Sequence, residues 1–191
     1  KKIGSKIKTI ILKSSTRVAL ITGSSRGIGA GIAKYLLDKG YFVYVTYFQD
    51  EKLARATFKK EKNVSIHKLN VGDQKSVVSL FKMVSKSSGK LHLLVNNAGV
   101  DYNLPIEKLD LARWEETFAV RAKGTFLMTK IFLPILRKAK RSTIINITSS
   151  WAYETQPDFS AATAAEAAKM NFTKTCAVAL AKYGIRTHSV N

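Results

Sequence analysis

The feature that most constrains the fold is a short apolar run that ends in a glycine-rich turn and leads into a helix-like segment. Residues 17–22 (RVALIT) have the length and composition of a buried strand. Residues 22–29 (TGSSRGIG) form the turn, and residues 28–39 have helical periodicity that stops at Gly40. A strand, a glycine-rich turn and a helix in this order predict the first unit of a parallel α/β sheet.

The same alternation continues along the rest of the 191 residues. Strands are expected at 41–47, 64–71, 91–95, 143–147 and 185–190, and helices at 51–62, 75–87, 110–138 and 161–183. In the first helix, the residues expected to share one face are Ile28, Ile32, Tyr35 and Leu36. The pattern predicts one Rossmann-type domain at 17–191, a doubly wound parallel sheet with helices on both faces, after a basic extension at 1–16.

The glycine-rich turn is the first candidate binding site. Glycines let a backbone approach a pyrophosphate, which then sits at the N-terminus of the following helix, where free N–H groups and the helix dipole favour negative charge. The expected cofactor contacts in this turn are Gly23, Ser25, Arg26, Gly27, Ile28 and Gly29. The alternative is that these glycines serve tight packing alone.

These residues resemble the short-chain dehydrogenase/reductase family, whose glycine motif is Thr-Gly-x-x-x-Gly-x-Gly. Residues 96–99 (NNAG), 144–149 (IINITS), 172–174 and 183–186 are similar to further family motifs in the family's order, so the resemblance covers 17–191. It is nearest to 3-oxoacyl carrier-protein reductases, and implies an NAD(P)(H)-dependent oxidoreductase for a carbonyl or hydroxyl substrate. The further cofactor contacts that it implies are Asn70, Val71, Asn97, Ala98 and Gly99.

The choice of cofactor depends on the end of the second strand. An Asp or Glu there would accept hydrogen bonds from the adenosine ribose and favour NAD. Residues 46–48 are instead Thr, Tyr and Phe, and Arg26 can meet a 2′-phosphate. We therefore expect NADP(H) rather than NAD(H), although Arg26 as a solvated surface residue remains the alternative.

The resemblance fails at the reaction centre. Active members of the family use a Ser, a Tyr, a Lys four residues after the Tyr, and an Asn on the preceding helix. Ser149 matches the serine, whereas the Tyr, Lys and Asn positions fall on Ala162, Glu166 and Arg121. Ala162 has no proton to give, and a carboxylate disfavours ionisation of a neighbouring acid. We predict a catalytically impaired or inactive chain, in which Arg121 and Glu166 pair because either charge buried alone would be costly.

Other reactive side chains indicate structural roles. Tyr35 alone among the seven tyrosines has a Lys four residues on, and we expect it to be a core aromatic away from the site. His67, His92 and His188 show no metal-ligand spacing, so no metal is expected. Cys176 lies among Ala and Val and is expected to be a small core residue.

The formal net charge of +19 is the remaining anomaly. A surface this basic attracts polyanions, so RNA or an acidic protein is a candidate partner, with residues 1–16 supplying much of the contact; a Lys-rich background composition is the alternative. The extension is a weak match to a transit peptide remnant, which leaves cytoplasm and organelle matrix both open. No apolar run is long enough for a membrane span.

Two hypotheses of function therefore stand. One is an enzyme of this family that is impaired at Ala162 and Glu166. The other is a non-catalytic structural or RNA-associated subunit, and a homo-oligomer is compatible with either. In the family, the strand at 185–190 leads into a Pro-Gly turn, a substrate loop, a helix and a last strand. We therefore expect a fold truncated after its sixth strand, either because the sequence is a fragment of a longer protein or because the fold was shortened during a change of role. The substrate is not specified by the residues present.

Overall fold

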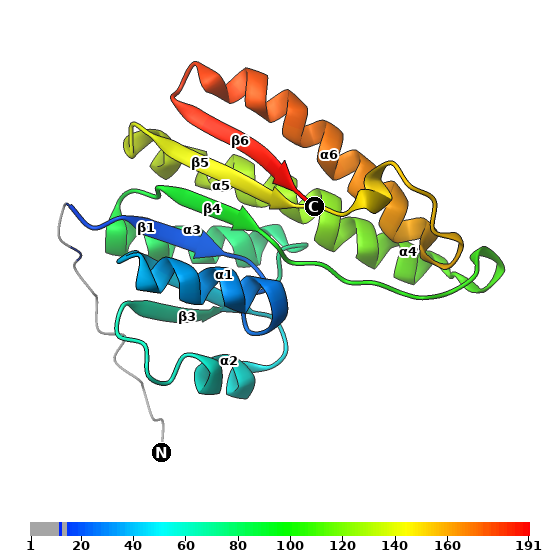
Figure 1. The fold of residues 1–191 in the computed structure, drawn as a ribbon, viewed down its shortest axis with the longest axis horizontal. Helices are drawn as coiled ribbons and strands as arrows, with labels where there is room; N and C mark the ends of the chain where they lie inside the picture. The colour runs from blue at the N-terminus through cyan, green and yellow to red at the C-terminus, as the bar shows by residue number, and fades with distance from the viewer. Residues whose placement is uncertain (1–11, 13–14) are drawn as a thin grey trace.

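A parallel sheet organises the chain. The computed structural model describes residue 12 and residues 15–191, and within them six strands lie in the order β3-β2-β1-β4-β5-β6 (Figure 1). The strands are β1 (Val18–Ile21), β2 (Phe42–Tyr47), β3 (Val64–Lys68), β4 (Leu93–Asn96), β5 (Ser142–Ile147) and β6 (Ile185–Val190). The chain order reverses between β1 and β4, and in open α/β sheets ligands bind at the carboxyl ends of the strands at such a point.

Helices cover both faces of the sheet. They are α1 (Gly27–Asp38), α2 (Glu51–Thr57), α3 (Gln74–Ser88), α4 (Leu111–Phe118), α5 (Gly124–Lys138) and α6 (Ser160–Ala181). Side chains of α1 join one core cluster, whereas those of α3, α5 and α6 join the cluster on the other face. The predicted doubly wound α/β fold is confirmed. No helix in the described part of the chain has the length and apolar character needed to cross a membrane.

The strands of the sheet centre are buried along their whole length. Every residue of β1 and β2 is buried, and both strands consist mainly of Val, Ile, Leu and aromatic residues. Such continuous apolar runs are what a strand covered on both faces requires. The β5 strand alternates between buried and partly buried residues, and β6 exposes most of its residues at the sheet edge.

Two predicted helices have different bounds in the structure. The helical segment expected at 110–138 is divided into α4 and α5 by a π-helical turn, Ala119–Lys123. Such turns are frequent at functional sites because the extra residue reorients side chains. The helix expected at 51–62 ends at Thr57, after which the aromatic side chain of Phe58 enters the core.

The interpretation of α1 as burying its large residues is wrong. Ile28 is 67% exposed and Tyr35 is 61% exposed, and the Tyr35 ring lies beside the Lys39 ammonium rather than in the core. The face toward the sheet carries Ala30, Ala33 and Leu36. Small residues let the helix approach the sheet closely, so the larger side chains are displaced outward. Cys176, in contrast, is buried as predicted.

The predicted basic extension lies almost entirely outside the described residues, which include only Leu12, Ser15 and Thr16 of it.

Candidate functional site

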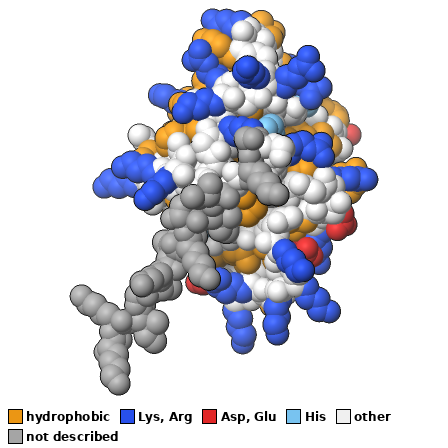
Figure 2. All heavy atoms as spheres, turned by 90° about the vertical axis from the view of Figure 1, so that its left-hand side faces the viewer, with side chains coloured by type: hydrophobic (Ala, Val, Ile, Leu, Met, Phe, Trp, Pro, Cys, Tyr) orange, Lys and Arg blue, Asp and Glu red, His pale blue; other side chains and the backbone are white. Residues whose placement is uncertain are grey.

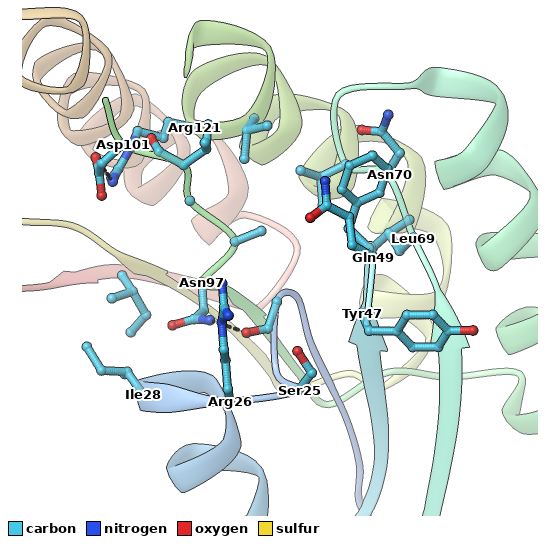
Figure 3. Close-up of a pocket in the computed structure, with 18 of the residues that line it drawn as sticks. Ser25, Arg26, Ile28, Tyr47, Gln49, Leu69, Asn70, Asn97, Asp101 and Arg121 are labelled. Atoms are coloured by element: carbon cyan, nitrogen blue, oxygen red, sulfur yellow. Dashed lines mark hydrogen bonds and ion pairs between the residues drawn. The ribbon is translucent and has the colours of Figure 1, made fainter. Parts of the chain in front are cut away.

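A cavity of about 700 Å³ opens at the carboxyl ends of the strands (Figure 3). The turn after β1, the end of β2 and the loops after β3, β4 and β5 line it. The sequence-predicted residues that line it are Gly23, Ser25, Arg26, Ile28, Asn70, Val71, Asn97, Ala98, Gly99, Arg121 and Ser149. Gly27, Gly29, Ala162 and Glu166 are not among the lining residues. Figure 3 shows Arg121 and Asp101 toward one end and Tyr47, Gln49 and Asn70 toward the other.

The glycines of the first turn have distinct roles. Gly23 and Gly27 adopt φ values of +61° and +57°, a region that residues with a side chain rarely occupy. A Cβ on Gly23 would lie 2.9 Å from the Cα of Ala98, so this glycine permits contact with the loop after β4. A Cβ on Gly27 would meet nothing within 4 Å, so space beside the backbone is open there. Gly29 permits packing instead, because its Cβ would lie 2.5 Å from Nδ2 of Asn97.

Hydrogen bonds join the first turn to the loop after β4. The Asn97 amide donates from Nδ2 to the carbonyl oxygens of Thr22 and Gly23, both at 2.9 Å. The Thr22 hydroxyl accepts from the backbone N–H groups of Asn97 and Ala98 at 2.9 and 3.0 Å. These bonds hold the two walls of the cavity at a fixed separation, which prepares the site for a ligand without side-chain rearrangement.

The end of β2 presents no free carboxylate to the cavity. Thr46 is buried, with its hydroxyl accepting from the Gly23 N–H at 3.2 Å. Burial, and then the hydrogen bond to Glu51, raise the pKa of the Tyr47 phenol. Asp50 lines the cavity, but its carboxylate caps α2 by accepting from the Leu53 N–H at 2.8 Å. Arg26, in contrast, is exposed at the rim.

Four charged side chains occupy the predicted reaction centre. Arg121, from the π-helical turn, forms an ion pair with Glu166 on α6, which confirms the predicted contact. Lys169 places its Nζ 2.7 Å from the same Glu166 oxygen, and Arg121 also pairs with Asp101. Glu166 is 0% exposed and Lys169 is 2% exposed. We call Asp101, Arg121, Glu166 and Lys169 the charge network.

Two members of the charge network were missed from the sequence. Lys169 lies three residues after Glu166, a spacing that brings side chains together on a helix, so this signal was present. Asp101 lies on the loop after β4, where no periodicity predicts a contact. The two cations and two anions balance formally. Burial lowers the pKa of Lys169, and the nearby Glu166 carboxylate opposes that shift.

The family's serine and tyrosine positions differ in what they offer. Ser149 lines the cavity, and its hydroxyl oxygen accepts from the Trp151 N–H at 3.3 Å. Ala162 is buried on α6, so no hydroxyl is present at the tyrosine position. At these two family positions the chain therefore offers the Ser149 hydroxyl and no phenol.

The histidines have structural partners or face solvent. The ring of His67 contacts the Ser65 hydroxyl at 2.6 Å, and Nδ1 of His92 accepts from the Val18 N–H at 3.0 Å. Burial is the main cause that lowers the pKa of both rings. His188 is exposed. In the described residues no group of three His, Cys, Asp or Glu side chains is placed to hold a metal.

Comparison with known proteins gives one consistent result. The sequence profile described as short chain dehydrogenase matches residues 17–191. Acetoacetyl-CoA reductase of Paracoccus denitrificans is 34% identical over 91% of this chain and 72% of its own length. A 3-oxoacyl-acyl-carrier-protein reductase of Staphylococcus aureus is 31% identical over 92% of this chain and 73% of its own. A solved metagenomic short-chain oxidoreductase in complex with NADP is 30% identical, with a TM-score of 0.85 over 91% of this chain and 79% of its own.

Proposed function

Because the chain belongs to the short-chain dehydrogenase/reductase family, we propose that its cavity binds NADP(H) and that its reaction centre, as it stands, supports little or no carbonyl reduction. The observation that carries the first part is the turn after β1. Gly23 and Gly27 have positive φ values there, and the space beside Gly27 is open. A bound NADP(H) would supply or accept a hydride; the residues of this chain would hold and orient it.

The residues of the cavity fit such a cofactor. The free N–H groups at the start of α1 suit the pyrophosphate. Residues lining the cavity from the loops after β3 and β4, including Asn70 and Ala98, suit the adenosine and nicotinamide ends. Arg26 at the rim is a cation for a 2′-phosphate, and Thr46, Tyr47 and Phe48 stand at the end of β2 in place of an acid that would accept hydrogen bonds from the ribose. These features favour NADP(H) over NAD(H).

The charge network supports the second part of the proposal. A positioned acid–base group is worth about 10²–10⁴ in rate, and Ala162 provides none. At the family's lysine position stands the Glu166 carboxylate, paired through Oε1 with Arg121 and Lys169, so an anion replaces the cation that this position supplies in the family. Ser149 alone can orient a carbonyl oxygen, but it lacks a partner that moves the proton.

Cofactor binding can be tested by fluorescence, because Trp151 lines the cavity. Titration with NADPH is expected to quench tryptophan emission saturably, and NADH is expected to bind more weakly. Arg26→Gln should reduce the preference for NADPH, whereas Lys34→Gln, on the exposed side of α1, should leave it unchanged. Failure of both cofactors to bind at millimolar concentration would contradict the proposal.

Catalysis can be tested by rebuilding the family's constellation. We expect no NADPH oxidation by the unmodified chain with acetoacetyl-CoA, the substrate named for a relative. The triple substitution Arg121→Asn, Ala162→Tyr and Glu166→Lys is expected to give turnover above the uncatalysed rate. Circular dichroism and the NADPH titration report whether this variant is folded. Turnover by the unmodified chain would show that the reaction centre lies elsewhere.

A further inference from the structure

The two edges of the sheet carry opposite charge. All the strands are parallel, so their amino ends lie along one side of the sheet and their carboxyl ends along the opposite side, and we call these two sides the amino edge and the carboxyl edge. Every segment that leads from a helix into a strand lies at the amino edge. In the described chain these segments, at 38–41, 58–63, 86–92, 137–141 and 181–184, contain eleven Lys and Arg and two acids. The segments at the carboxyl edge, at 22–26, 48–50, 69–73, 97–110 and 148–159, contain two bases and seven acids. Of these two edges, the positively charged one is therefore the amino edge, on the side away from the cavity.

Helix capping explains only part of this asymmetry. Helix C-termini favour cations and N-termini favour acids, and the side chains of Asp50, Asp73 and Asp110 do cap helices at the carboxyl edge. The effect is confined to the last turn, whereas Lys62 and Arg141 lie beyond the helices that precede them. Figure 2 views the amino edge and shows Lys and Arg side chains distributed over much of this face, with few acids among them.

The geometry of this edge fits an extended chain of anions. Neighbouring strands lie about 4.8 Å apart, so six strands make an edge of roughly 24 Å. Phosphates of one strand within a double helix follow one another at about 3.4 Å along the axis, so about seven of them span such an edge, and a more extended single strand places fewer there. The number of cations in the five segments is sufficient to contact each of them.

The side chains at the amino edge suit phosphodiesters and offer no apolar anchor for a membrane. The Arg17 guanidinium lies 4.4 Å from the centre of the Tyr41 ring, and that of Arg137 lies 4.0 Å from the Tyr183 ring. An arginine stacked in this way keeps its planar set of donors ordered, and that set matches a phosphate bidentately. In the described residues, no large exposed hydrophobic side chain lies in these five segments, so a membrane would find nothing to insert.

We propose that the amino edge of the sheet binds the phosphate backbone of single-stranded RNA. This surface is separate from the cavity proposed for the cofactor, which lies at the opposite edge of the sheet. RNA binding therefore does not depend on the proposed NADP(H) binding, and the two ligands occupy the protein together. Because backbone contacts carry no base readout, the surface shows little sequence preference.

The test compares two variants of the full chain with equal net charge. The edge variant carries Lys60→Gln, Lys62→Gln, Lys138→Gln and Lys182→Gln, and the control variant carries Lys34→Gln, Lys52→Gln, Lys108→Gln and Lys174→Gln. All eight lysines are exposed, and both variants retain residues 1–16. Affinity for a labelled oligouridylate of about 20 nucleotides is followed by fluorescence anisotropy between about 50 and 200 mM salt.

The unmodified chain and the control variant are expected to bind with similar affinity and salt dependence. Four lost phosphate contacts should reduce the slope of log K against log salt by about 2.8, at about 0.7 for each contact with single strands, and lower the affinity at least tenfold. Saturating NADPH should leave RNA affinity unchanged, and the edge variant should retain the NADPH affinity of the unmodified chain.

Several results would overturn the proposal. They are the absence of RNA binding at low salt, equal losses in the two variants, and displacement of RNA by NADPH. Tighter binding to polyglutamate, or to vesicles that contain phosphatidylglycerol, would replace RNA with an acidic protein or a membrane as the ligand of this surface. An edge variant that also loses NADPH binding would indicate a damaged fold. Two double variants then replace the fourfold ones: Lys60→Gln with Lys62→Gln as the edge pair, and Lys34→Gln with Lys52→Gln as the control pair. An equal loss in these pairs overturns the proposal, and a loss confined to the edge pair supports it.

Discussion

The carboxyl edge and the amino edge of the sheet treat charge in different ways. At the carboxyl edge Arg121, Glu166 and Lys169 leave water almost completely, and each has a partner of opposite sign. At the amino edge charges of one sign accumulate, with side chains such as Lys60 and Lys138 exposed. The difference shows that solvent access, rather than the amount of charge, decides whether a fold must neutralise it locally.

Desolvation accounts for this difference. A buried ion loses several kcal/mol of hydration, which only close partners and hydrogen bonds offset. An exposed ion keeps its hydration, and salt screens it from neighbours beyond about 8 Å at physiological ionic strength. Substitution of a buried charge at the carboxyl edge should therefore lower the free energy of unfolding by several kcal/mol more than substitution of an exposed charge at the amino edge.

Removal of the central anion should have the largest effect. Glu166→Gln leaves Arg121 and Lys169 buried without their shared carboxylate. Loss of one partner of a buried pair costs about 3–5 kcal/mol, and we expect a loss of this size in the free energy of unfolding. Urea denaturation followed by circular dichroism measures it.

The double variant Glu166→Leu with Lys169→Met supplies the control. It removes one buried cation together with the anion, and Arg121 keeps Asp101 as a partner. It should therefore be more stable than Glu166→Gln. Glu51→Gln breaks an exposed pair with Arg55, which should cost less than about 1 kcal/mol. If Glu166→Gln and Glu51→Gln were equally mild, the charge network would not depend on burial.

The difference between regular elements and loops explains which residues of the site could be predicted from the sequence. The resemblance to the family placed Glu166 at the lysine position and Arg121 at the asparagine position, and these two positions share one pocket in the family. Apolar runs identified the buried strands, because a strand that is covered on both faces needs apolar residues along its length. Asp101 was not predicted, because it lies on a loop whose path depends on tertiary packing.

The errors share a physical origin. The sequence pattern placed the large residues Ile28 and Tyr35 on an apolar face of α1, whereas close packing on the sheet selected the small residues Ala30 and Ala33. The π-helical turn at Ala119–Lys123 has no signal in apolar periodicity, since it adds a residue without a change in composition. Local patterns indicate that elements exist, and contacts between elements decide how they are oriented.

A pH effect is expected at the amino edge. Burial, followed by Lys90 and Arg17, lowers the pKa of His92, and Nδ1 must be unprotonated to accept from the Val18 N–H. Below the unfolded pKa of about 6.5 the unfolded chain binds more protons, so stability falls as the pH decreases toward the folded pKa. His92 contributes a slope of at most about 1.4 kcal/mol per pH unit, reduced by solvent screening.

His92→Asn should flatten part of this acid limb, because an amide oxygen can accept the same bond without titrating. Urea denaturation between about pH 7 and pH 5 measures the slope. His188→Asn, at an exposed ring, is the matched control and should leave the slope unchanged. Identical slopes for the unmodified chain and His92→Asn would show that neither burial nor the neighbouring cations lower the pKa of His92 in the folded chain.

Helix capping at the carboxyl edge should have a smaller effect. The Asp73 carboxylate accepts from the backbone N–H groups of Lys75 and Ser76 at 3.0 and 3.2 Å. Asp73→Ala should cost about 1 kcal/mol of stability, within the usual range of 0.5–2 for a lost N-cap. Asp73→Asn keeps one of the two acceptor oxygens and should therefore cost less than Asp73→Ala. An equal loss in both variants would assign the effect to negative charge rather than to the cap.

The smallest effect is expected for exposed lysines of the amino edge. Lys60 and Lys62 extend into solvent next to Lys59, so their mutual repulsion is screened but not absent. Lys60→Gln combined with Lys62→Gln should change stability by less than about 0.5 kcal/mol, with a slight gain at low salt, since surface substitutions seldom exceed this size. The gain should vanish between about 10 mM and 1 M salt, as the Debye length falls from 30 to 3 Å. A loss of more than about 1 kcal/mol would mean that these lysines contribute to the fold, and the free surface inferred for RNA would have to exclude them.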